Sequence, residues 1–181
     1  IVDKYLHHLP LERQVRVMAT QGLVVDSQTL WDQIFALSRH CLPTWNALRM
    51  HILGQTVVGV DQTPWPNLDK DATKVWQMWC LTSTDAVWHA IRDDKSAETF
   101  TALLNEYAGT VVCDAAATHF AGARANPKIT LATCWAHAYR KFEEALADFK
   151  EARVAIDFIK KLYEIEADIR GLPSEVRRAL R

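Results

Sequence analysis

Two apolar runs of the sequence each end in an aspartate. The first run, residues 56–60, is followed by Asp61, and the second, residues 110–113, is followed by Asp114. Runs rich in β-branched residues are typical of buried strands, and a carboxylate next to such a strand must reach solvent, a hydrogen-bond donor or a cation. Either aspartate alone could simply begin the turn or helix that follows it. Two of them after similar runs favour a metal site of paired carboxylates, since Mg²⁺ and Mn²⁺ prefer such oxygen ligands.

A third carboxylate for this site could come from Glu143 or Glu144, which follow the last apolar run on a predicted helix. The alternative is that the Lys-Phe-Glu-Glu run at residues 141–144 forms the solvent-exposed face of that helix. Cys134 and His137 also have the C-x-x-H spacing of half a zinc site, which Cys113 or His119 could join. The competing interpretation is a core cysteine beside a histidine that is hydrogen-bonded or faces DNA.

Candidate nucleic-acid contacts lie near the same residues. Arg140 and Lys141 follow His137 at the start of a helix and could contact phosphates, although exposed basic residues there are common without such a role. Trp65 stands between two prolines close to Asp61, and it is expected to pack on the sheet or instead to stack on a base. The other tryptophans of this region, Trp76, Trp79 and Trp88, are expected to pack on the sheet.

The elements that would position these residues follow from periodicity. Two helices are expected over residues 10–22 and 26–54, the second broken at Pro43, and a prolyl loop at residues 64–67 follows the first strand. A helix capped at Asp94 or Ser96 is expected to close at Gly109, and another to span residues 136–150, with further helices to the end of the chain. Strands are predicted over residues 56–61, 75–82, 86–91, 110–114 and 129–134.

This order of elements indicates an α/β, ribonuclease H-like fold. It predicts a mixed sheet of about five strands with flanking helices, plus an N-terminal helical hairpin and C-terminal helices. In such a fold the first and fourth strands are parallel neighbours, which would bring Asp61 and Asp114 within reach of common cations.

Composition limits the class of protein. The chain has 181 residues, of which 49% are hydrophobic and 24% charged, enough for one good core and a small helical appendage. A net charge of -1 gives no global basic field, so nucleic-acid binding must come from local patches. No signal peptide or membrane-spanning run is visible. The chain starts at Ile1 rather than methionine, and we expect a fragment.

Four cysteines without paired spacing indicate reduced thiols in a cytosolic protein: Cys41, Cys80, Cys113 and Cys134.

Five segments, in order along nearly the whole chain, resemble the insertion-sequence sixty-six family of bacterial DDE transposases. The most specific is the Cys-Trp-Ala-His…Arg-Lys-Phe stretch at residues 134–142. The others are Lys-Tyr…Leu-Pro-Leu at residues 4–11, Gly-Val-Asp-Gln-Thr-Pro at 59–64, Tyr-Ala-Gly-Thr-Val-Val-Cys-Asp at 107–114 and Leu-Tyr-Glu-Ile-Glu at 162–166.

The resemblance implies a catalytic domain in which Asp61 and Asp114 are the first two acidic residues. It further implies two Mg²⁺ (or Mn²⁺) ions, with Asp61 bridging both and Asp114 binding one, and DNA as partner, both the element ends and the target. A homo-oligomer would form the active complex, in the bacterial cytoplasm and at the nucleoid.

The chain also departs from the family pattern. Gln62 stands where the family commonly has Glu, and Ala115 and Ala116 where it has Gly-Tyr. The third acid of the family lies in an Asn-Asn-x-x-Glu-Arg-like motif, which does not occur before Arg181 and is expected beyond it. We therefore predict an N-terminal helical region (1–54), an incomplete catalytic core (55–150) and the start of a helical insertion (151–181), inactive in isolation. The alternatives are a non-catalytic DNA-binding or assembly module and a ribonuclease H-like nuclease that only hydrolyses.

Overall fold

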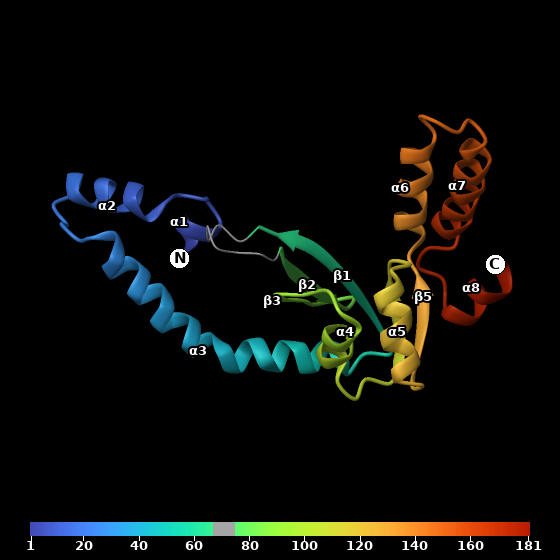
Figure 1. Ribbon diagram of the computed structural model, residues 1–181, viewed down its shortest axis with the longest axis horizontal. Helices are drawn as coiled ribbons and strands as arrows, with labels where there is room; N and C mark the ends of the chain where they lie inside the picture. The colour runs from blue at the N-terminus through green and yellow to red at the C-terminus, as the bar shows by residue number, and fades with distance from the viewer. Residues whose placement is uncertain (67–74) are drawn as a thin grey trace. The chain divides into compact units, whose positions relative to one another are not determined.

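The structure is a computed structural model, and it describes residues 1–66 and 75–181. The chain divides into two compact units, Ile1–His51 and Ile52–Arg181, which are taken in turn (Figure 1). The finer domain boundaries expected from the sequence, at residues 54 and 150, stay a prediction.

The first unit is helical, as predicted. It contains α1 (Val2–Tyr5), α2 (Leu11–Thr20) and most of α3 (Ser27–Leu53). Gly22 follows α2 with a φ of 87°, a backbone conformation that favours glycine, and the carboxylate of Asp26 accepts the amide hydrogen of Thr29 at 2.6 Å to cap α3.

The predicted break at Pro43 is wrong, because α3 continues through this residue. Proline has a φ compatible with the helix and removes one hydrogen bond to the carbonyl four residues earlier. Pro43 and Arg39 are both exposed, so water can solvate the carbonyl that this leaves without its helical partner.

The second unit is built on a five-stranded mixed sheet in the order β3-β2-β1-β4-β5. The strands β1 and β2 pair antiparallel, as do β2 and β3, whereas β4 runs parallel to both β1 and β5. This confirms the predicted ribonuclease H-like arrangement. The strands are β1 (Val57–Trp65), β2 (Trp76–Thr82), β3 (Val87–Arg92), β4 (Gly109–Cys113) and β5 (Ile129–Thr133).

The first strand is longer than predicted. A loop was expected from Pro64 onward, but Pro64 lies in β1 opposite Gln77 of β2. The pairing of β4 with β1 covers only Val57 to Gly59, so beyond Gly59 one edge of β1 has no β4 residue beside it. Pro64 lies in this part of β1, and a proline, which has no N–H to donate, is tolerated at a free strand edge. The remainder of the predicted loop, at Asn67, falls outside the described residues.

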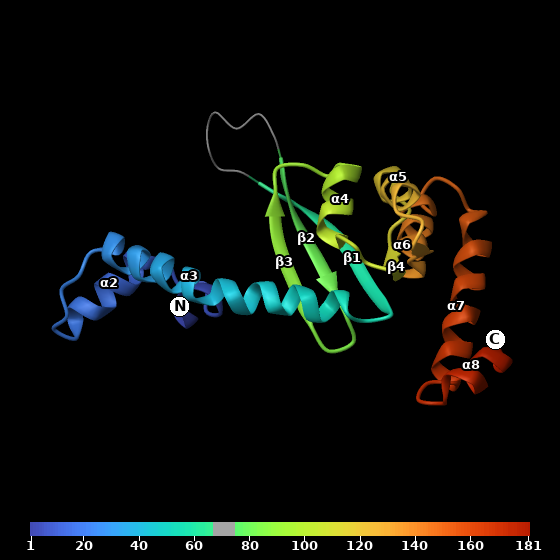
Figure 2. The same ribbon diagram turned by 90° about the horizontal axis from the view of Figure 1, so that it is seen from below.

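Two helices, α4 (Ala97–Leu104) and α5 (Ala117–Ala125), pack against each other and complete the core (Figure 2). Ser96 caps α4 by accepting the amide hydrogen of Thr99 at 3.1 Å. The helix ends at Leu104 with Asn105 at a φ of 52°, not at Gly109 as predicted, since asparagine tolerates a positive φ. The fully buried core side chains include Val58, Trp79, Leu81, Phe100, Leu104 and Val111.

Three helices follow the sheet: α6 (Trp135–Ala145), α7 (Ala152–Asp168) and α8 (Ser174–Leu180). Helix α6 packs along α7 and ends five residues earlier than predicted (Figure 1). Glu166 of α7 forms ion pairs with Arg177 of α8 and with Arg181.

The tryptophans divide into two kinds. Trp79 and Trp88 are buried in the sheet core, as predicted, whereas Trp76 is exposed because it pairs with Trp65 at the far end of β1 and β2. Trp76 and Trp65 are therefore not part of the buried core, and their packing on the sheet stays a prediction.

Candidate active site

The parallel pairing of β1 and β4 brings the two predicted aspartates to one end of neighbouring strands. Gly59 lies opposite Val112, and the same register continued by two residues places Asp61 beside Asp114. Val58 and Val60 are buried while Gly59 is half-buried and Asp61 exposed, so Asp61 lies on the more open face of β1. The predicted strand neighbourhood is confirmed; common ligation of cations by the two carboxylates stays a prediction.

Asp61 is held loosely. Its side chain is 56% exposed, and its Oδ1 accepts the amide hydrogen of Gln62 at 2.8 Å. The Nε2 atom of His137 lies 3.8 Å from the same oxygen, which is an electrostatic contact and too long for a hydrogen bond. Cys80 of β2 lies opposite Asp61 in the antiparallel pairing of β1 and β2. Burial raises the pKa of the Cys80 thiol, and the charge of Asp61 adds a smaller increase.

Asp114 is held firmly. It directly follows β4, and its Oδ1 accepts the amide hydrogen of Ala116 at 3.1 Å, just before α5 begins. The Nδ1 atom of His119, on the first turn of α5, lies 2.7 Å from the same oxygen. The side chain of Asp114 is 32% exposed, so this carboxylate is fixed by the protein on one side and open to solvent on the other.

A cavity of about 460 Å³ opens beside Asp114, between the ends of β4 and β5 and the first turns of α6. The Nδ1 atom of His137 is buried with no hydrogen-bond partner among the described residues, and Lys141 lies one turn farther along α6. The walls are mostly small or apolar, and the cavity is lined by Asp114, Ala115, Ala116, Thr133, Cys134, His137, Ala138, Lys141 and Phe142.

The remaining predicted contacts are placed as follows. Arg140 and Lys141 are exposed on α6, and Lys141 Nζ forms an ion pair with Glu144 at 2.6 Å. Trp65 is 44% exposed and lies on β1, four residues beyond Asp61.

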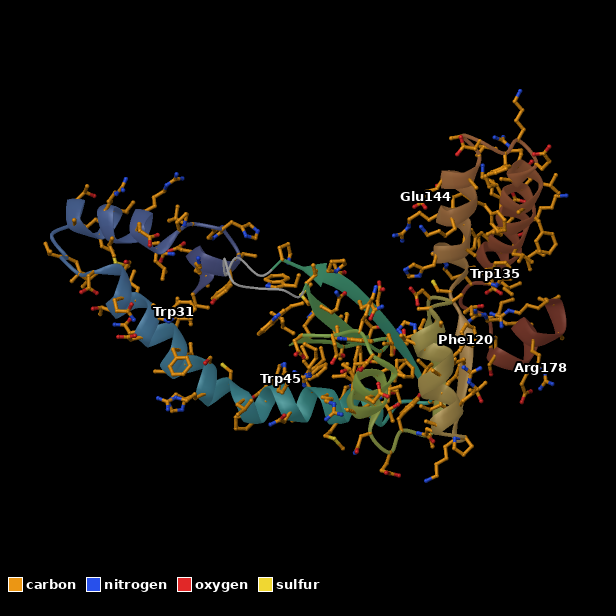
Figure 3. The ribbon with its side chains drawn as sticks, in the orientation of Figure 1. Trp31, Trp45, Phe120, Trp135, Glu144 and Arg178 are labelled. Carbon is orange, nitrogen blue, oxygen red and sulfur yellow. The ribbon has the colours of Figure 1, made fainter. Side chains whose placement is uncertain are left out.

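The candidates for a third ligand do not join the two aspartates. Figure 3 shows Trp135 at the start of α6 and Glu144 toward its other end. Glu144 lies seven residues beyond His137, or about 10 Å along the helix axis. Glu143 hydrogen-bonds to Tyr139, whose pKa it raises. Within residues 1–66 and 75–181, no three His, Cys, Asp or Glu side chains form a group that could hold a metal ion, so neither the zinc alternative nor a complete three-acid site is assembled there.

The sequence considered His119 only as a zinc candidate and missed its contact with Asp114. The signal available was a histidine five residues after the aspartate, in an alanine-rich helix. Since the contact depends on how α5 folds back on β4, spacing alone could not establish it.

All four cysteines are free, as predicted. Burial, followed by the charge of Asp114 and the neighbouring Cys134, raises the pKa of the Cys113 thiol to about 11. No helix in the described part of the chain is long and apolar enough to cross a membrane.

The sheet order defines a ribonuclease H-like domain, with two aspartates at the ends of neighbouring strands. The profile of the Transposase IS66 family matches residues 1–181, the whole chain. The chain therefore belongs to this family, as the sequence segments had indicated.

Relatives of the whole chain include two uncharacterized proteins of Sinorhizobium fredii (strain NBRC 101917 / NGR234). Protein y4jD is 30% identical over 199 residues, covering 100% of this chain and 39% of the relative, and y4hP is 29% identical over 210 residues, covering 100% and 38%. The chain thus spans about two fifths of the length of these curated relatives.

Among solved structures, one similar chain belongs to the simian T-cell lymphotropic virus intasome in complex with PP2A regulatory subunit B56 gamma. It is 12% identical, with a TM-score of 0.35, over 68% of this chain and 45% of that chain.

Proposed function

We propose that this chain forms the catalytic core of a DDE-type DNA transposase, which cuts and joins phosphodiester bonds at the ends of an insertion sequence. The observation that carries the proposal is the parallel pairing of β1 and β4, which delivers Asp61 and Asp114 to the same end of the sheet. Because the chain belongs to a transposase family, the reaction that we propose for this pair of carboxylates is the cutting and joining of DNA.

The donor set fits a hard divalent cation such as Mg²⁺ or Mn²⁺. Asp61 is exposed and Asp114 has one side open, so both can offer carboxylate oxygens without a change in the fold. When bound, two such cations would activate a nucleophile and relieve charge on the phosphate. We propose that a third acid outside residues 1–181 completes this site in the whole protein.

The protein's own groups would orient the DNA. His137 lies next to Asp61 and lines the cavity beside Asp114, so it is placed to contact a phosphate or sugar close to the cations. Arg140 and Lys141 extend the polar surface along α6, and Trp65 extends it along β1. The partners would be element ends and target DNA, with a homo-oligomer as the active complex in the bacterial cytoplasm, at the nucleoid.

A strand-transfer assay on the complete protein tests the proposal. The assay supplies DNA carrying the element ends, a target plasmid and Mg²⁺ or Mn²⁺. Asp61→Asn and Asp114→Asn should each lower end cleavage and joining at least about a hundredfold, whereas the exposed Asp148→Asn should leave both unchanged.

Two other outcomes would replace the proposal. Metal-independent DNA binding without cleavage would indicate a DNA-binding or assembly module, and cleavage without joined product would indicate a nuclease. Full activity of the two aspartate variants would show that these carboxylates do not carry the chemistry.

A further inference from the structure

His119 is an unusual residue for the interior of this domain. Its side chain is 1% exposed, and its ring packs against Phe100 at a centroid distance of 5.0 Å and against the edge of Trp79 at 6.0 Å. Burial of a polar ring among aromatic side chains costs free energy unless the ring makes hydrogen bonds. Within the described residues, only Nδ1 has partners, the backbone oxygen of Asp114 at 3.4 Å and its carboxylate Oδ1 at 2.7 Å, while Nε2 is buried without a partner.

The hydrogen bonds at Asp114 are divided unequally between its two oxygens. Oδ1 accepts the amide hydrogen of Ala116 and lies 2.7 Å from Nδ1 of His119, and the same Nδ1 is 3.4 Å from the backbone carbonyl oxygen of Asp114. The other oxygen, Oδ2, accepts no hydrogen bond from the residues that the structure describes. The protein thus occupies one oxygen of this carboxylate and leaves the other one open.

We propose that His119 is a positioning residue for Asp114, whose carboxylate it fixes through Oδ1 so that Oδ2 is presented to the divalent cation. The inference rests on the proposed function of Asp114 as a metal ligand. A carboxylate that must rotate into place loses conformational entropy on binding a metal, and a donor held in a packed ring removes part of that cost.

The packing around His119 explains why a ring suits this role. The imidazole is fixed between α4 and β2 by Phe100 and Trp79, so its Nδ1 has little freedom to move away from Asp114. A purely structural histidine would need only a hydrogen-bond acceptor, and the effect of removing it would be confined to stability.

The test measures Mn²⁺ affinity of the complete protein without DNA, by isothermal titration calorimetry, with the melting temperature in EDTA recorded for each variant. His119→Asn keeps an amide donor near the place of Nδ1, whereas His119→Leu keeps an apolar side chain of similar size and removes the donor. Phe100→Leu is the matched control, because it disturbs the same packing without touching Asp114. Asp114→Asn reports on the underlying metal site.

We expect His119→Leu to weaken Mn²⁺ binding about tenfold or more, and His119→Asn to stay within about threefold of the wild type. Phe100→Leu should lower the melting temperature but leave the affinity unchanged. If His119→Leu does not fold, His119→Gln replaces it in the test. The amide donor of glutamine lies one bond farther from the backbone than that of asparagine, so His119→Gln should bind Mn²⁺ more weakly than His119→Asn.

The failure of this inference is distinguishable from that of the proposed function. Unchanged Mn²⁺ affinity in His119→Leu, together with weakened binding in Asp114→Asn, overturns the positioning role alone. Unchanged affinity in Asp114→Asn, or no Mn²⁺ binding by the wild type, overturns both.

Discussion

The two aspartates should differ sharply in what they contribute to stability when no metal is bound. We consider Asp61→Ala and Asp114→Ala, measured in EDTA. Asp61 is 56% exposed and, among the described residues, hydrogen-bonds to the neighbouring amide of Gln62 alone, so its removal resembles an ordinary surface substitution, worth within about 0.5 kcal/mol.

Removal of the Asp114 carboxylate has a larger cost. The change eliminates the hydrogen bond from the Ala116 amide to a charged acceptor and the 2.7 Å contact of Oδ1 with Nδ1 of His119. It leaves this 1% exposed ring with only the 3.4 Å contact of Nδ1 with the backbone oxygen of residue 114. A hydrogen bond to a charged group is worth about 1.5–3 kcal/mol, and a buried unsatisfied group costs about 1–3 kcal/mol. Because these contributions overlap, we expect a loss of about 2–4 kcal/mol.

Differential scanning calorimetry of the two variants measures this difference. For a chain of this size, about 2–4 °C of melting temperature corresponds to each kcal/mol, so Asp114→Ala should melt roughly 4–16 °C below the wild type and Asp61→Ala within roughly 2 °C of it. Asp114→Asn keeps an acceptor oxygen and should lie between them. Equal melting temperatures for Asp61→Ala and Asp114→Ala would refute the reasoning, since they would show that the contact between Asp114 and His119 does not stabilise the fold.

Three other residues give separate tests. Because the pKa of Cys113 is raised to about 11, its alkylation rate in the folded protein, followed by mass spectrometry, should keep rising about tenfold per pH unit from pH 8 to 10; a plateau near pH 9 would contradict this. Gly122→Ala should destabilise the domain by about 1–3 kcal/mol in urea unfolding, because a Cβ there would clash with the Phe100 ring, and an unchanged midpoint would show that the ring moves aside freely. Hydrogen bonds from two arginines lower the pKa of Glu166 to about 2, so its ionised carboxylate stabilises the folded state above about pH 4.5 and loses this effect as the pH falls toward 2. The melting temperatures of Glu166→Gln and the wild type should therefore converge over that pH range, and a constant difference between them would be contrary to expectation.

The sequence predicted the sheet because its strands carry local signals. The β-branched run at residues 56–60 predicted β1, and the order of strands and helices gave β4 as its parallel neighbour. The nearness of Asp61 and Asp114 followed from that topology alone.

The features that the sequence missed depend on tertiary surroundings. Pro64 was expected to end β1, but the shortness of β4 leaves an edge where a proline is harmless. Pro43 was expected to break α3, but it is exposed, so the carbonyl that it leaves unpaired can be solvated. The contact of His119 with Asp114 joins two elements whose packing no local pattern encodes.

The central claim is that Asp61 and Asp114 together hold the catalytic cation. The most direct test is a crystal structure of the complete protein with Mn²⁺, in which the metal is located by its anomalous scattering. We predict a peak within about 2.0–2.4 Å of oxygens from both carboxylates, Oδ2 in the case of Asp114. Mn²⁺ bound elsewhere at saturating concentration, with both of these carboxylates free of metal, would contradict the account.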